Sequence, residues 1–242
     1  TLGGAVWGAL PAWLRARFGV SELLVSLMLV YIAEQLLSYL VFGPWKDPQG
    51  YNFPQTPMFA EAARIPRLLA AFGRLRVNLG LPLAGLTCLG SWLYLSRTYA
   101  GYRLLVSGLS PRAATYAGFS SQRTVWTAFL VSGALAGLAG ALEVAGPVGQ
   151  LTPHVPMGYG FAAITVAFVG RLHPVGVTLA ALLTSMFYIG GELAQSRLGL
   201  PKSLTGVFQG LLLFALLAAD TLVQYRVRWW GFRKTAPAET RA

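Results

Sequence analysis

Residues 125–145 read VWTAFLVSGALAGLAGALEVA, and this stretch decides the fold class. Its single ionisable side chain, Glu143, lies near its end. A run of about 20 apolar residues is long enough to cross the hydrocarbon core of a bilayer, which is about 30 Å thick. The stretch therefore predicts a transmembrane helix.

The rest of the chain repeats this pattern. Its 242 residues are 55% hydrophobic and 11% charged, whereas soluble domains carry about 25% charged residues. Further apolar stretches cover 2–14, 20–42, 79–95, 157–193 and 204–222. We therefore predict an all-α polytopic transmembrane bundle that forms a single domain over 1–242. The stretch 2–14 is too short for a full span, so we expect further helices before Thr1.

One apolar stretch is interrupted by Gly-Arg-Leu-His-Pro at 170–174. The part before it, Phe161 to Val169, measures roughly 13 Å as a helix, at about 1.5 Å per residue. That is less than half the bilayer core, so we predict a broken, half-membrane helix. Broken backbone at this depth requires cover from protein or a water-filled cavity, so we expect it inside the bundle or near a pathway.

The basic residues predict the orientation. If Arg15 and Arg17 are placed on the cytoplasmic side and the helices alternate, twelve of the 19 Lys and Arg residues lie on that side. Most of the other seven lie in one long outer loop, 43–78. Cytoplasmic loops carry the excess of positive charge. This rule predicts a cytoplasmic C-terminus with a basic tail over 226–242. In the outer loop, 60–72 has the apolar spacing of a helix lying on the membrane surface.

A short helix with marked ends is predicted on the cytoplasmic side. Ser110 suits the N-cap, Pro111 the first helical position and Gly118 the position after the C-cap. A helix of two turns is not stable alone, so it needs a partner surface. Its own bundle and a separate protein both remain open as that partner.

This segment, followed by VSGALAGLAGALE at 131–143, resembles the permeases of the ribose, simple-sugar and nucleoside branch of ABC importers. The similarity extends through SELLVSLMLVYIA at 21–33, GYGFAAITVAFVGRLHP at 158–174 and Gly-Gly-Glu at 190–192. The last two stretches are most similar to the nucleoside-type permeases. The resemblance covers nearly the whole chain in order.

The resemblance implies a transport subunit that moves a nucleoside or related simple sugar inward by alternating access. The implied partners are cytoplasmic ABC ATPase subunits, a second permease subunit and an extracytoplasmic substrate-binding lipoprotein, in a lipid membrane. The short helix is similar to the coupling helix that contacts the ATPase. The residues carried over for that contact are Gly108, Ser110, Pro111, Arg112, Ala113, Ala114, Tyr116, Ala117 and Gly118.

Two further sets of residues are candidates for function. An ionisable group within a span indicates function, and Glu34 lies midway along its stretch. With it, Tyr31, Phe161 and Thr165 are expected to line the translocation path. Glu143 and Glu192 lie near span ends, where a solvated carboxylate explains them equally well. For helix packing, the small-xxx-small pairs Gly133/Gly137 and Ala136/Gly140 are expected to allow close approach.

Several kinds of chemistry find no support in the sequence. His154 and His173 have no Cys or carboxylate at metal-ligand spacing, and no nucleophile and base pair or phosphate-binding Gly-rich loop with Lys-Ser/Thr is present. We therefore expect no catalytic residue, metal or cofactor, and ATP hydrolysis on separate subunits. The net charge of +11 flanks apolar runs and does not indicate nucleic-acid binding. A branched-chain amino acid ABC permease, an ion-coupled secondary transporter and a polytopic membrane enzyme remain as alternatives.

Overall fold

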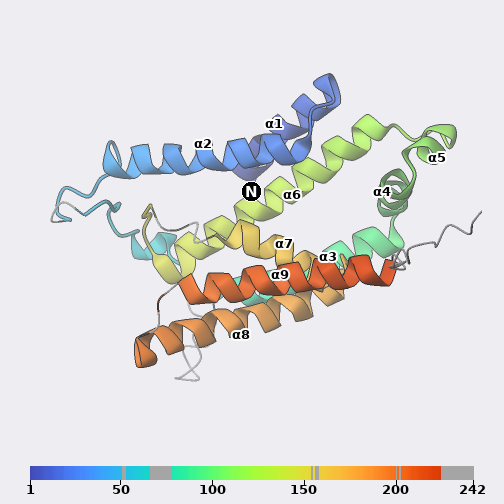
Figure 1. The fold of residues 1–242 in the computed structure, drawn as a ribbon. Coiled ribbons are helices and arrows are strands. Elements are labelled where there is room, and N and C mark those ends of the chain that lie inside the picture. The colour runs from blue at the N-terminus through green and yellow to red at the C-terminus, as the bar shows by residue number, and fades with distance from the viewer. Residues whose placement is uncertain are drawn as a thin grey trace, which may run out of the picture. The chain divides into compact units, whose positions relative to one another are not determined.

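The computed structural model describes residues 1–50, 53–65, 78–153, 155, 158–199, 201 and 203–224 (Figure 1). Within these ranges the ordered elements are helices, and none is a β-strand, which confirms the predicted all-α class. The chain forms two compact units. Unit 1 comprises Thr1–Gly160 and His173–Val175, and unit 2 comprises Phe161–Leu172 and Gly176–Ala242. The predicted single domain over 1–242 remains a prediction, and the tail 226–242 lies outside the described residues.

Most of the helices follow one another with short connections, but the connection between α2 and α3 is long. Unit 1 holds α1 (Leu2–Phe18), α2 (Glu22–Phe42), the 3-10 turn η1 (Glu61–Ala63), α3 (Gly80–Arg97), α4 (Tyr99–Leu109), α5 (Pro111–Tyr116), α6 (Ser121–Glu143) and the π-helical turn η3 (Val144–Val148). Most of α7 (Tyr159–Val169) and α8 (Pro174–Leu198), together with α9 (Ser203–Gln224), belongs to unit 2.

The closest helix pair in unit 1 is α1 with α6, joined through glycines. A Cβ added at Gly137 would lie 2.9 Å from the Gly4 Cα, and one added at Gly8 would lie 2.7 Å from the Phe129 carbonyl oxygen. The pairing of early α1 residues with late α6 residues makes the two helices antiparallel. Small residues let helix backbones approach closely, so dispersion contacts replace the hydrophobic drive that lipid does not provide.

Unit 1 gathers its helix ends into two groups. At one end, α1 stops at the left-handed Gly19, and an ion pair between Arg15 and Glu22 connects it to the start of α2. The antiparallel α6 begins at that same end, and Ser107 of α4 reaches α6 there, with its hydroxyl 3.5 Å from that of Thr124. The segments predicted to be cytoplasmic in unit 1 therefore share one end. At the opposite end the loop 53–65 is bonded to η3, which follows α6, and to the residues just after η3.

Between α7 and α8 the chain reverses over four residues. Arg171 and Leu172 both adopt left-handed conformations, with φ of 51° and 54°. Their amides donate to the carbonyls of Phe168 and Ala167, which closes α7. A Cβ at Gly170 would collide with the backbone of Val177, so glycine permits this reversal. This turn lies at the interruption 170–174 of the sequence, and the broken, half-membrane helix stays a prediction.

The exposure of apolar side chains indicates a lipid environment. Three described helical segments are long and apolar enough to cross a membrane: Glu22–Phe42, Ser121–Val148 and Pro174–Leu198. Only 0% to 6% of the residues in their most apolar windows are buried by the chain itself. Soluble proteins rarely expose large contiguous apolar surfaces. The protein is therefore a multi-pass membrane protein. The spans expected at 79–95 and 204–222, and the partial span at 2–14, stay predictions.

The surface helix predicted over 60–72 is not formed as expected in its described part. Only η1 is helical there, and Arg64 has extended backbone with ψ of 139°. The Ile65 amide donates to the Ala145 carbonyl, at 3.0 Å. This bond to η3 replaces the bond that a continuing helix would make. Residues 66–72 lie outside the described residues.

Candidate functional site

The helix α5 is formed by the local signals that predict it. The Ser110 hydroxyl accepts from the Ala113 amide at 3.4 Å, and Pro111 occupies the first turn. At the other end Gly118 has φ of 78°. The Gly118 and Phe119 amides donate to the carbonyls of Thr115 and Ala114 at 3.0 and 2.9 Å, a double closure that glycine in the left-handed region allows. Both predicted helix ends are confirmed.

Packing against α4 and α6 holds α5 in place. The Ala114 side chain is fully buried, with 0% exposure. The Phe119 ring lies edge-on to the rings of Tyr99 and Tyr102, with centroids 5.9 and 6.4 Å apart. Such edge-to-face pairs each contribute about 0.5–1.5 kcal/mol beyond area burial. The buried Ala114 side chain and the ring contacts of Phe119 with Tyr99 and Tyr102 therefore hold α5 against the bundle.

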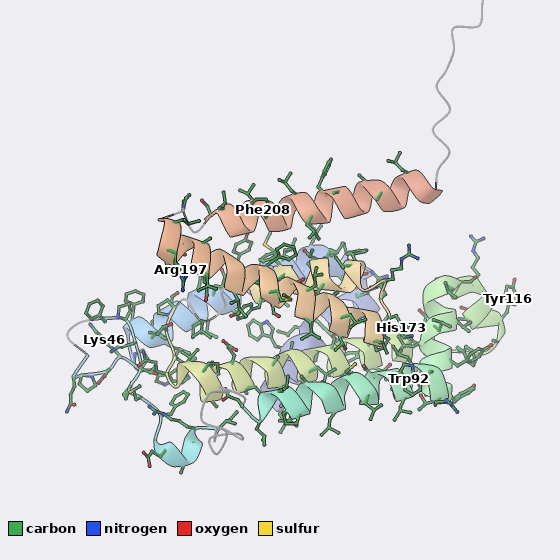
Figure 2. The ribbon with its side chains drawn as sticks, turned by 90° about the horizontal axis from the view of Figure 1, so that it is seen from below. Lys46, Trp92, Tyr116, His173, Arg197 and Phe208 are labelled. Carbon is green, nitrogen blue, oxygen red and sulfur yellow. The ribbon has the colours of Figure 1, made fainter. Side chains whose placement is uncertain are left out.

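The other side of α5 is open. Apart from Ala114, each of its residues is exposed, as are Ala117 and Gly118 just after it. Tyr116 is 94% exposed, and in Figure 2 it points away from α4 and α5, at the opposite end of unit 1 from Lys46. We call the exposed side chains of 111–118, without Ala114, the α5 face. Ala114 is also expected to contact an ATPase, but its side chain is covered by its own chain, and its contact with an ATPase stays a prediction.

Two of the residues expected on the path, Phe161 and Thr165, lie in unit 2. Thr165 is 3% exposed and lines a cavity of about 600 Å³ between α7, α8 and α9. The polar atoms of this otherwise apolar wall come from Thr165, Thr184 and Tyr188. Cavities of about 300–1,000 Å³ with few polar groups suit small molecules. Phe161 is 51% exposed and does not line this cavity.

The other two path candidates, Tyr31 and Glu34, lie on α2 in unit 1. They are three residues apart, hence on one helix face, and both are exposed. Each unit is described by itself, so convergence of the two pairs into one path remains a prediction. Of the carboxylates near span ends, Glu143 is half-buried and Glu192 is exposed.

The predicted packing pairs behave differently from each other. Gly133 and Gly137 face α1, where a Cβ at Gly133 would lie 3.2 Å from the Gly8 Cα. A Cβ at Gly140 would meet no atom within 4 Å, and Ala136 is exposed. The second pair meets no other described helix, so its role in packing stays a prediction.

The partner glycines, Gly4 and Gly8, were not identified from the sequence. Their spacing of four carried the signal, but the stretch 2–14 was too short to be taken as a full span. Among the described residues no three His, Cys, Asp or Glu side chains gather in a way that could hold a metal ion. His154 lies outside those residues.

These observations define a multi-pass helical membrane protein that carries a short, capped and exposed helix at one end of its bundle. The family described as "Branched-chain amino acid transport system / permease component" has a model that matches residues 1–217, and the chain belongs to this family. The resemblance seen in the sequence is thereby confirmed.

Individual relatives come from sugar and nucleoside systems. The chain is 36% identical over 231 residues to a glucose ABC transporter permease protein of Haloferax volcanii, across 93% of the chain and 60% of that protein. It is 34% identical to a guanosine ABC transporter permease protein of Bacillus subtilis, across 84% of the chain and 58% of the relative. A nucleoside ABC transporter permease protein of Lactococcus lactis is 28% identical, across 87% and 59%.

The chain thus spans about three fifths of the length of these relatives. No solved structure matches it.

Proposed function

We propose that this chain is the membrane-spanning part of an ABC importer permease, which moves a nucleoside or related simple sugar inward by alternating access. The observation that carries the permease role is the family match over residues 1–217. The substrate class is supported by the glucose, guanosine and nucleoside permease relatives. The chain itself is a transport subunit, and ATP hydrolysis takes place on separate cytoplasmic ATPase subunits.

The α5 face is the proposed contact with the ATPase. A capped two-turn helix that buries only Ala114 leaves its remaining side chains available to a partner. Exposed Tyr116 is the side chain best suited to fill a pocket, because tyrosine is enriched among the residues that dominate binding energies at interfaces. Its anchorage through Phe119 to Tyr99 and Tyr102 would transmit a push on α5 to α4.

The proposed orientation rests on this contact for unit 1 and on the excess of basic residues for the C-terminus. The end of unit 1 that holds α5 faces the cytoplasm, as does the C-terminus, and the loop 43–78 faces outward. An extracytoplasmic substrate-binding lipoprotein delivers the substrate to the outer side. A second permease subunit completes the pathway. Thr165, with the cavity it lines, is the best supported of the four path candidates.

Site-directed cross-linking tests the ATPase contact. Tyr116→Cys in a Cys88→Ala background, with the ATPases present, should cross-link to them through a short bifunctional maleimide. The matched control is Phe53→Cys in the same background, because Phe53 is 67% exposed and lies in the loop at the opposite end of unit 1. A cross-link from position 53, or none from position 116 in an intact complex, would contradict the proposal.

Transport assays test the substrate class. Cells that lack their own permease and express the complete system should accumulate labelled guanosine or glucose in preference to labelled leucine. Uptake of leucine alone would favour the branched-chain amino acid alternative. Uptake that persists without the ATPases and follows an ion gradient would favour a secondary transporter. Thr165→Leu should lower uptake in either case, whereas the ATPase cross-link should be unchanged.

A further inference from the structure

A second cavity, of about 400 Å³, lies in unit 1 at the end opposite to α5. Its walls come from the loop 53–65, from Asn78 just before α3, and from the turn η3 that follows α6. The lining residues are Met58, Arg64, Ile65, Asn78, Gly146, Pro147, Val148 and Gly149. We call it the Arg64 cavity.

Backbone bonds and glycines build the Arg64 cavity. The Phe59 amide donates to the Gly149 carbonyl and the Ile65 amide to the Ala145 carbonyl, each at 3.0 Å. A Cβ at Gly146 would lie 3.0 Å from the Asn78 side-chain nitrogen. At Gly149, which has φ of 71°, a Cβ would lie 3.5 Å from the Arg64 Nε. The two glycines therefore make room for the Asn78 amide and the Arg64 guanidinium in the cavity wall.

The charge of Arg64 has no partner among the described residues. Its Nε is buried and lacks a hydrogen-bond acceptor there, and no described carboxylate pairs with it. The sequence from 66 to 77 adds three arginines and no acid. Arg64 as a whole is half-buried, and a buried donor atom without an acceptor is costly. The chemistry that would satisfy it is an anion with several acceptor oxygens, which a guanidinium binds through two parallel hydrogen bonds.

The position of the cavity selects the source of that anion. The apolar segment Ser121–Val148 has 28 residues, or about 42 Å at about 1.5 Å per residue. The hydrocarbon core is about 30 Å thick, and about 40–45 Å with the headgroup regions. The end of this segment, where the cavity lies, therefore reaches the headgroup level. The walls formed by Met58, Ile65 and Val148 are apolar, which suits the part of a lipid next to its phosphate.

We propose that the Arg64 cavity binds the phosphate group of a membrane phospholipid, with the Arg64 guanidinium and the Asn78 amide as its donors. The bound lipid ties the loop 53–65 to the end of α6. This inference does not depend on the direction of transport or on its substrate.

Lipid retention by the purified full chain tests the proposal. The protein is purified in mild detergent, titrated with phosphatidylglycerol and measured by native mass spectrometry. Arg64→Gln should weaken the tightest phosphatidylglycerol site about tenfold, the factor that corresponds to losing one strong interaction. The control is Arg17→Gln, which removes an exposed arginine at the end of α1 and should change this affinity less than about twofold.

A second variant distinguishes a loss of lipid binding from misfolding of the protein. Arg64→Lys keeps the charge and most of the stem but loses the planar fork, and it should weaken retention by a smaller factor. Equal retention by the wild type and both folded variants would overturn the proposal. The last measurement replaces the lipid with inorganic phosphate. If phosphate alone stabilises the wild type but not Arg64→Gln, and lipid adds nothing, the site takes free phosphate and the assignment to lipid is overturned.

Discussion

Replacing Gly133 with alanine should push α1 away from α6. The added Cβ would lie 3.2 Å from the Gly8 Cα and 3.3 Å from the Gly4 carbonyl carbon, and nearer still to the Gly4 carbonyl oxygen. All three are backbone atoms, so no flexible side chain can move aside. Overpacking of this kind costs about 1–3 kcal/mol.

The higher helix propensity of alanine stabilises the variant, so its contribution must be subtracted from the measured change in stability. Glycine to alanine inside a helix gains about 1 kcal/mol. Gly140→Ala makes the same change seven residues later on α6, where the new Cβ meets nothing within 4 Å. The difference between the two variants isolates the steric cost, about 1–3 kcal/mol.

Thermal unfolding in detergent, followed by tryptophan fluorescence, measures this difference. For chains of this size 1 kcal/mol corresponds to about 2–4 °C. Gly133→Ala should therefore unfold about 2–12 °C below Gly140→Ala. Adding Gly4→Ala to Gly133→Ala should cost less than the sum of the single effects, because the helices separate only once. Equal Tm values for Gly133→Ala and Gly140→Ala would refute close glycine packing as the basis of the α1–α6 contact.

Three further changes probe the α5 segment and the α7–α8 turn. Ala114→Asp buries a carboxylate without a partner, at a cost of several kcal/mol. This variant should lose the monodisperse peak in size-exclusion chromatography, whereas Ala113→Asp should retain the peak. Ser110→Ala removes the N-cap and about 0.5–1 kcal/mol of local stability, so amide exchange at Ala113 should accelerate while exchange in α6 stays constant. In a residue with a side chain the left-handed conformation costs about 1–2 kcal/mol. Leu172→Gly removes this cost and should raise Tm. Leu172→Ala should not, and a Tm rise for both would contradict the backbone argument.

The sequence by itself determined the features that depend on local interactions. The all-α membrane class follows from the length and polarity of each stretch, since a span must satisfy its own backbone. The ends of α5 follow from Ser110 and Gly118, because each cap is a hydrogen bond between residues only a few positions apart. The break before Pro174 is equally local.

Only the tertiary structure decided which of two equivalent sequence patterns makes a packing contact. Gly133/Gly137 and Ala136/Gly140 have the same spacing on α6, but α1 covers only the first pair. Ala113 and Ala114 are chemically identical neighbours, yet only Ala114 is buried. The Arg64 cavity joins residues about 80 positions apart, so no local pattern could reveal it. Local composition specifies what each helix is, whereas the choice of face depends on which other helix lies beside it.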